Sequence, residues 1–272
     1  MSLWLVVLIV FVADALALTA MLLVRRRAPD GSFVRDSEQV SATINVAGTV
    51  LAVLIGFVFL IAFESYGKAR SNSQDEASAT TALFHTAEAF PAADRNRIQG
   101  NAICYARAVI HGDFGHTAGG TGLADRWTQT LEHAFERVRV SGAAGAAAEQ
   151  NFFLQSDARQ KARQGRLAQA SPLIPTAIWF LLILGSLAVI VFVLSFADIG
   201  ERKAVQTGLI VVVTTVLTAA LLTIAFLDDP YGDHEGAIFP TAMRSTLSSM
   251  EHEQATRHPA PVPCGPDGRP TA

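Results

Sequence analysis

The sequence predicts an all-α integral membrane protein with four transmembrane helices and a helical extramembrane domain between the second and the third. Half of the 272 residues are hydrophobic and only 17% are charged, against about 25% charged residues in soluble domains. Four apolar runs are long enough to cross the roughly 30 Å hydrocarbon layer of a bilayer. Residues 64–171 show apolar side chains at helical spacing and no alternating strand pattern.

The first span covers residues 1–24. Its start is neutral and its apolar run is long, whereas a cleaved signal peptide needs a charged start and a shorter core. Arg25, Arg26 and Arg27 end it. We therefore expect a retained helix in contact with lipid.

The second span is the first half of a helix predicted over residues 43–90, apolar to Phe63 and polar beyond Glu64. Ile55, Phe59 and Phe63 lie on one face, each one turn after the last. Such a stripe is either a surface that packs on neighbouring helices or, in an oligomer, an apolar constriction around a pore. The spacing leaves both interpretations open.

The third span is predicted over residues 178–196, after Pro172 and Pro175, which stop an incoming helix and suit the first turn of the next. The fourth follows from residue 205 or 207 to Leu227. Four segments result: residues 1–63 (spans one and two), 64–171 (the extramembrane domain), 172–236 (spans three and four with an acidic exit turn) and 237–272 (a tail).

The extramembrane domain is predicted to contain two amphipathic helices. One has Ile98, Ala102, Tyr105 and Val109 on one side, and the other has Trp127, Leu131, Ala134 and Val138. Residues 258–272 are rich in proline and poor in apolar side chains, so we expect a disordered tail. Cys104 and Cys264 lie far apart without metal-ligand spacing, which predicts two free thiols.

Charge predicts the orientation in a cell (inner) membrane. The two short loops hold Arg25, Arg26, Arg27, Arg35, Arg202 and Lys203. Basic residues in short loops favour the cytoplasm, so the extramembrane domain is expected outside it. Four basic residues also precede span three from the other side, Arg159, Lys161, Arg163 and Arg166, but long segments are translocated largely regardless of charge.

Two intramembrane polar residues are candidates for function. Asp14 falls near the middle of span one, where an ionisable side chain is costly unless it faces protein or water. Asn45 in span two or a threonine of span four is a candidate partner. The carboxylate either makes a structural hydrogen bond between helices or serves conduction.

The sequence contains few residue patterns that are typical of a metal site or of an enzyme. Asp229, Asp233 and Glu235 cluster after span four, and such oxygen ligands suit calcium, although the pattern favours a solvated turn that caps the membrane end. His111, Asp113 and His116 form half of a metal site at most. No residue stands in a recognisable nucleophile motif, and a net charge of −3 without a basic run gives no sign of a nucleic-acid partner. We expect neither an enzyme nor a resident cofactor other than calcium.

Several short motifs resemble a known family in their order and spacing. They are Val24-Arg-Arg, Asn45-Val-Ala-Gly-Thr-Val-Leu-Ala-Val-Leu-Ile-Gly-Phe, Tyr66-Gly-Lys-Ala, Glu76-Ala77, Arg163-Gln-Gly-Arg-Leu167, Ile174-Pro175, Trp179 and Asp229-Pro-Tyr-Gly232. Together they resemble the bestrophin-like family of bacterial and plant membrane proteins, which is similar in span layout to the bestrophins.

The resemblance implies a homo-oligomer, pentameric as bestrophins are, that conducts anions. Bestrophins line a narrow neck with an Ile and two Phe at four-residue spacing, which Ile55, Phe59 and Phe63 reproduce. Their Asn-Pro-Phe-Gly turn leads into an acidic calcium clasp, which His234 and Gly236 interrupt here. Bestrophins also keep the long segment in the cytoplasm, opposite to the orientation that the arginines predict.

Two functions from different classes remain. The first is an oligomeric ion channel, passing inorganic anions, with span two lining the pore. The second is a non-conducting membrane scaffold or stress sensor whose helical domain binds a partner.

Overall fold

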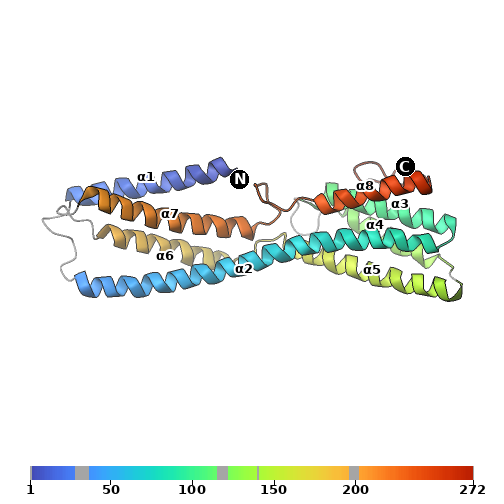
Figure 1. Cartoon of the computed structure of the whole chain (residues 1–272), viewed down its shortest axis with the longest axis horizontal. Coiled ribbons are helices and arrows are strands. Elements are labelled where there is room, and N and C mark those ends of the chain that lie inside the picture. Colours follow the sequence, from blue (N-terminus) through green and yellow to red (C-terminus); the bar gives the residue numbers. More distant parts are fainter. Residues whose placement is uncertain (1, 28–36, 115–121, 140, 196–201, 272) are drawn as a thin grey trace. The chain divides into compact units, whose positions relative to one another are not determined.

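The computed structural model describes residues 2–27, 37–114, 122–139, 141–195 and 202–271. Its described elements are helical, apart from one isolated bridge between Cys264 and Pro270. Four helices are long and apolar enough to cross a membrane. They are α1 (Leu3–Arg27), α2 (Ser37–Thr86), α6 (Thr176–Ser195) and α7 (Lys203–Asp228) (Figure 1). The predicted spans and the predicted all-α fold class are confirmed.

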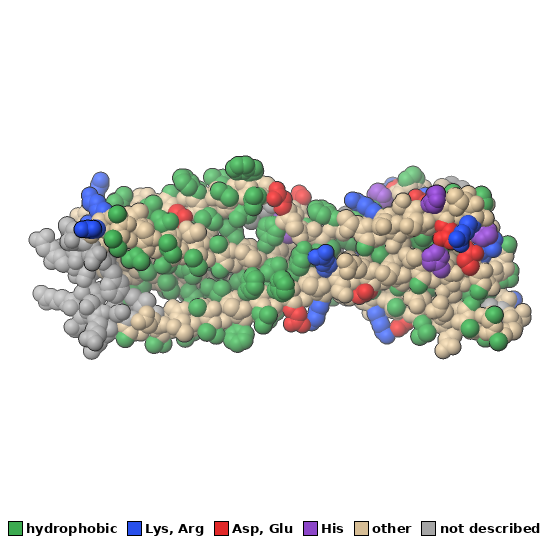
Figure 2. Space-filling view, in the orientation of Figure 1, with side chains coloured by type: hydrophobic (Ala, Val, Ile, Leu, Met, Phe, Trp, Pro, Cys, Tyr) green, Lys and Arg blue, Asp and Glu red, His purple; other side chains and the backbone are tan. Residues whose placement is uncertain are grey.

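The chain divides into two compact units. The membrane unit contains residues 1–65, 172–229 and 233–236, and the extramembrane unit contains residues 66–171, 230–232 and 237–272. The long helix α2 contributes residues to both. Hydrophobic side chains are spread over the visible face of the membrane unit, whereas most of the visible acidic and histidine side chains lie on the extramembrane unit (Figure 2).

In the membrane unit, α7 packs on α1 and α6. Ala17 and Met21 of α1 contact Ile210 of α7 in one apolar cluster. A second cluster joins Ala62 of α2 to helices α6 and α7. Helices α2 and α6 approach each other closely, because a Cβ added at Gly185 of α6 would lie 2.8 Å from the side chain of Leu51 of α2. The exposed apolar side chains of these helices are those that lipid covers in a bilayer.

The extramembrane unit packs the polar half of α2 with α3 (Ala92–Ala108), α4 (Leu123–Glu136), α5 (Gly142–Ala168) and α8 (Thr241–Arg257). A 3-10 turn, η1 (Ala87–Ala89), follows α2. The π-helical turn η2 (Val109–Asp113) ends α3. The predicted apolar faces of α3 and α4 are buried, since Ile98, Tyr105 and Leu131 are at most 1% exposed. Helix α8 lacked a clear sequence signal, since it has few apolar positions.

The C-terminal segment corrects two predictions. Cys104 and Cys264 form a disulfide rather than two free thiols. Residues 258–271 are packed rather than disordered, because the chain supplies polar partners for a segment that has little apolar surface. Trp127 Nε1 donates to the Gly268 carbonyl at 2.6 Å, and Arg107 Nη1 donates to the Cys264 carbonyl at 3.0 Å.

Gly268 allows the C-terminal segment to approach α3 closely. Its φ is +77°, and an added Cβ would lie 2.5 Å from the backbone nitrogen of Ala108. Only glycine combines that backbone conformation with that approach. The disulfide, the tryptophan and the glycine therefore hold the tail against α3 and α4.

Candidate functional site

The three predicted pore residues lie along α2 but do not share one environment. Ile55 is half-buried and packs against the cluster that contains Leu182 and Ile224. Phe59 and Phe63 are 40% and 58% exposed, and their rings stack with centroids 6.3 Å apart. A four-residue step advances about 400° around a helix with 3.6 residues per turn, so the stripe winds away from the helices that contact Ile55. Both rings are therefore open over a large part of their surface.

A different face of α2 is exposed as well. Val53, Phe57 and Leu60 are 51%, 62% and 59% exposed. They lie at helical spacing on the side opposite to Ala62, which is buried. Either face is available to lipid or to a second copy of the chain. Phe57 therefore provides a residue of the same type as Phe59 on another side of the same helix.

Asp14 is paired inside the membrane unit. Thr215 Oγ1 of α7 donates to its Oδ2 at 2.9 Å, so the partner is the threonine of span four rather than Asn45. Asn45 is exposed, and its backbone carbonyl accepts a hydrogen bond from Thr49 Oγ1. Asp14 Oδ1 is buried and has no hydrogen-bond partner among the described residues. The carboxylate thus retains one free acceptor that faces protein.

The calcium candidates are not assembled into a metal site. Asp229, Asp233 and Glu235 are exposed, and no group of three potential metal ligands exists among the described residues. His234 occupies the turn instead. Its Nε2 lies 2.7 Å from the Asp229 carbonyl, and its ring lies 4.0 Å from that of Phe226. The imidazole of His234 thus makes the printed contacts of this turn, and the three carboxylate residues are exposed rather than gathered around one point.

The carboxylate that does organise the exit of α7 is Asp228, which the sequence analysis did not single out. It is buried and accepts from the backbone nitrogens of Leu173 and Ile174 at 2.8 and 3.0 Å. Trp179 Nε1 donates to its other oxygen at 3.4 Å. These bonds satisfy the backbone that enters α6. Its place directly before Asp229-Pro230, at the end of an apolar run, was the available signal.

A buried ionic network lies in the core of the extramembrane unit. Arg166 Nε donates to Glu76 Oε2 at 2.6 Å, and its Nη2 donates to Asp113 Oδ2 at 3.2 Å. Arg163 Nε also reaches Asp113, at 3.0 Å, and Arg163 bonds Asp125. The turn η2 contains Asp113 and contributes it to this network. Asp113, one of the three residues considered as half of a metal site, thus forms ion pairs instead, and His116 lies outside the described residues.

Tyr105 and Arg159 complete this network. Tyr105 donates its hydroxyl proton to Glu76 Oε1 at 2.6 Å, and burial, aided by the charge of Glu76, raises the pKa of its hydroxyl. The guanidinium carbon of Arg159 lies 4.4 Å from the centroid of the Tyr105 ring, a cation–π contact. The signal in the sequence was the spacing of Arg159, Arg163 and Arg166, which places three arginines on one face of a helix.

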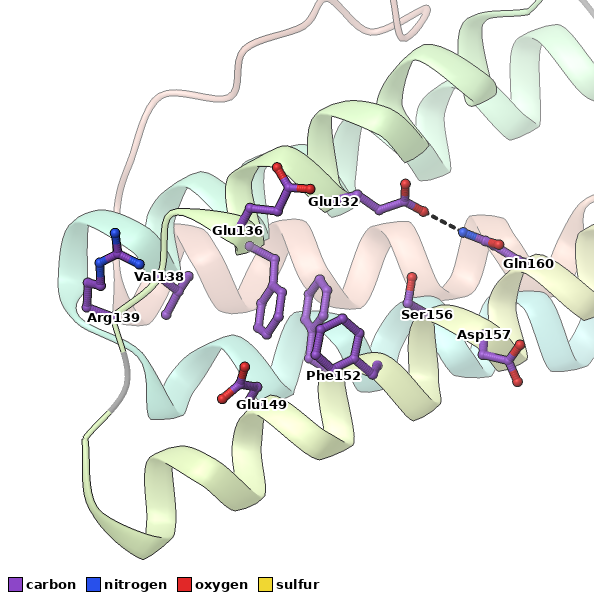
Figure 3. A pocket seen from close by; sticks show the side chains of 11 residues that line it. Glu132, Glu136, Val138, Arg139, Glu149, Phe152, Ser156, Asp157 and Gln160 are labelled. Atoms are coloured by element: carbon purple, nitrogen blue, oxygen red, sulfur yellow. Dashed lines mark hydrogen bonds between the residues drawn. The ribbon is translucent and has the colours of Figure 1, made fainter.

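A pocket of about 510 Å³ opens between α4 and α5. Three phenylalanines form its apolar part, Phe135, Phe152 and Phe153. Carboxylates surround them, and Figure 3 shows Glu132, Glu136, Glu149 and Asp157 around the rings. The sequence analysis missed this pocket because its residues come from two helices joined by residues 137–141.

Comparisons with known proteins place the chain in a family. A model of the bestrophin-like domain matches residues 10–234. No curated protein matches the chain in sequence. Solved structures of a bacterial bestrophin homologue from Klebsiella pneumoniae, carrying single substitutions, align with TM-scores of 0.70 and 0.71. Both are 14% identical, and each alignment covers 91% of this chain and 99% of the other. At that identity the similarity shows the fold alone.

Proposed function

The chain belongs to the bestrophin-like family, a multi-pass membrane family, and we propose that several copies assemble around an axis into an ion channel. In this proposal α2 lines the pore and inorganic anions pass through it. By resemblance to bestrophins the assembly is a pentamer. The observation that carries the proposal is the stacked pair Phe59 and Phe63, whose side chains are 40% and 58% exposed on a membrane helix.

An uncovered aromatic pair on a membrane helix has two possible neighbours, lipid or another copy. When copies surround an axis, rings at this position narrow the pore, and apolar constrictions gate by excluding water. Ile55 lies one turn earlier and packs on its own chain, which would anchor the helix beside the opening. The proposed constriction is therefore Phe59 and Phe63, with Ile55 at its edge.

The test is ion flux in liposomes that contain the purified protein. Phe59→Ala and Phe63→Ala remove a ring each and are expected to raise flux above that of wild type. Phe57→Ala is the matched control, because Phe57 is equally aromatic and exposed on another face of α2. An increase only in Phe57→Ala would move the pore to that face. Absence of chloride, sodium and potassium flux in all four proteins would refute the channel.

The oligomeric state tests the same proposal independently. Mass measurement of detergent-purified protein is expected to give a homo-oligomer. A monomer would leave no axis around which α2 could line a pore. Such a result would favour the alternative function, a membrane scaffold or stress sensor. The pocket between α4 and α5 is the observation that supports a ligand-dependent role of that kind.

We also propose that the extramembrane unit faces away from the cytoplasm. Arg25, Arg26 and Arg27 end α1, and Arg202 and Lys203 stand at the start of α7, so these basic residues flank the two short loops between membrane helices. Basic residues in short loops favour the cytoplasm. The disulfide between Cys104 and Cys264 supports the same side, because disulfides persist in oxidising compartments and are rare in the cytosol. This orientation is opposite to that of bestrophins.

Thiol labelling of intact cells tests the orientation. Ser248→Cys adds an exposed thiol on α8 and is expected to react with a membrane-impermeant reagent. Ala204→Cys, exposed in the first turn of α7, is expected to react only after lysis. Wild type serves as the control, since its cysteines are paired. Exchange of these two patterns would place the extramembrane unit in the cytoplasm.

A further inference from the structure

The pocket between α4 and α5 combines an aromatic surface with an acidic rim. Phe135 and Phe152 stack with ring centroids 3.9 Å apart, and Phe153 meets Phe135 edge to face at 5.1 Å. The first two are at most 7% exposed, but Phe153 is 58% exposed. An aromatic side chain that is held by two neighbours and yet open on one side is a preformed contact surface for an apolar or cationic group.

Four carboxylates and one guanidinium line the same space, so its charge is negative. Glu136 and Asp157 pair with His133 and Lys161 at the surface, and Glu132 accepts from Gln160. Glu149 has no such partner among the described residues. Figure 3 shows it on the α5 side of the rings. Within the described residues, the pocket therefore contains a carboxylate, that of Glu149, without an ion-pair partner.

Ser156 adds a hydroxyl to the lining of the pocket. Its side chain is only 7% exposed, and its hydroxyl has no hydrogen-bond partner in the described part of the chain. Figure 3 shows the hydroxyl directed into the space between α4 and α5. The hydroxyl lines the pocket, so it is available to hydrogen-bond a polar group of a ligand.

We propose that this pocket binds an amphipathic organic cation. The ligand's ammonium group would lie between Phe153 and the carboxylate of Glu149, and its apolar body would cover Phe152. Cations are attracted to the face of an aromatic ring, and the carboxylates exclude anions. A bare divalent cation does not fit, because no three potential metal ligands are grouped among the described residues. The site is independent of conduction and of orientation.

Calorimetry with the full-length protein in detergent tests the proposal, and benzyltrimethylammonium is the probe. Two control compounds report the heat of partition into the micelle. Phenylacetate has a similar apolar body with an anionic group, and benzyl alcohol is neutral. Wild type is expected to bind the cation and neither control. Equal heats for the three compounds, or no saturable heat for the cation at millimolar concentration, would overturn the proposal.

Two variants localise the binding. Phe153→Ala is expected to weaken it about 2- to 5-fold, as a cation–π contact at an open site does. Glu149→Gln is expected to weaken it and to reduce its salt dependence. Phe239→Ala and Asp75→Asn are the matched controls, since both side chains are exposed in the same unit outside the pocket. Equal affinity in Phe153→Ala and Phe239→Ala would refute the assignment.

A second copy of the chain is the competing occupant. If the pocket is an interface, Phe153→Cys will crosslink to a neighbouring copy in the purified oligomer, and the probe will not bind. That pair of results would refute a ligand site. Binding of the probe to the intact oligomer without a crosslink would support it. Because every readout is binding or crosslinking, failure of the channel proposal in flux measurements leaves this test unaffected.

Discussion

Arg166 on α5 and Glu76 on α2 form a charged hydrogen bond of 2.6 Å between side chains that are 90 positions apart and almost fully buried. Burial by itself would lower the pKa of the guanidinium, but the charge of Glu76, its hydrogen bond and Asp113 raise it. The arginine therefore stays charged, and the pair ties the polar half of α2 to α5.

Breaking this pair should destabilise the protein strongly. Arg166→Met leaves Glu76 buried without its counter-charge, which costs about 3–5 kcal/mol when one partner of a buried ion pair is removed. The midpoint of thermal unfolding in detergent measures the loss. Lys161→Met is the control, because Lys161 and Asp157 form an exposed pair that contributes about 0–1 kcal/mol. Equal midpoints for the two variants would contradict the prediction.

Removal of the disulfide should release the tail. Replacing Cys104 and Cys264 by serine opens a loop of 160 residues, and loss of a native disulfide typically costs about 2–5 kcal/mol. We expect a lower unfolding midpoint and faster proteolysis of residues 258–271. Gly268→Ala should loosen the same segment with the disulfide intact, since its Cβ has no room. Unchanged mobility of wild type on gels with and without reductant would show that no disulfide forms.

Alkaline pH should lower the free energy of unfolding through the ionisation of Tyr105. Its pKa is raised in the folded state, chiefly by burial and further by Glu76, and is about 10 in an unfolded chain. The unfolded state therefore releases the proton first, so stability is lost as pH rises above about 10, by at most about 1.4 kcal/mol per pH unit. Tyr105→Phe should reduce that slope. A residual slope is expected, because burial also raises the pKa of Tyr231.

The two roles of Asp14 are separable by substitution. Asp14→Asn retains the hydrogen bond from Thr215, so a structural role predicts intact assembly, whereas Asp14→Leu should loosen the oligomer. A role in conduction predicts that Asp14→Asn changes flux or its pH dependence and leaves assembly unchanged. Thr215→Val removes the same hydrogen bond from the other side. If these variants match wild type in both assays, the carboxylate lies in water or lipid headgroups.

The membrane helices were predictable from the sequence because the signal is local. The apolar runs near residues 3–24, 44–63, 178–196 and 205–227 are each longer than a helix in a soluble core needs. Burial of Ile98, Tyr105 and Leu131 followed from helical periodicity for the same reason. Each inference needed only residues within a few turns of one another.

Only the tertiary structure decided which distant residues meet. The spacing of the cysteines predicted free thiols, but the fold of the tail over α3 brings Cys264 to Cys104. The spacing of Arg159, Arg163 and Arg166 is compatible with one face of a helix, but no sequence pattern reveals that Glu76 and Asp113 face Arg163 and Arg166. Asp14 had several possible partners, and helix packing selected Thr215. Helical propensity and hydropathy depend on neighbours in sequence, whereas ion pairs, disulfides and pockets depend on loop closure and packing between segments that the sequence order leaves free.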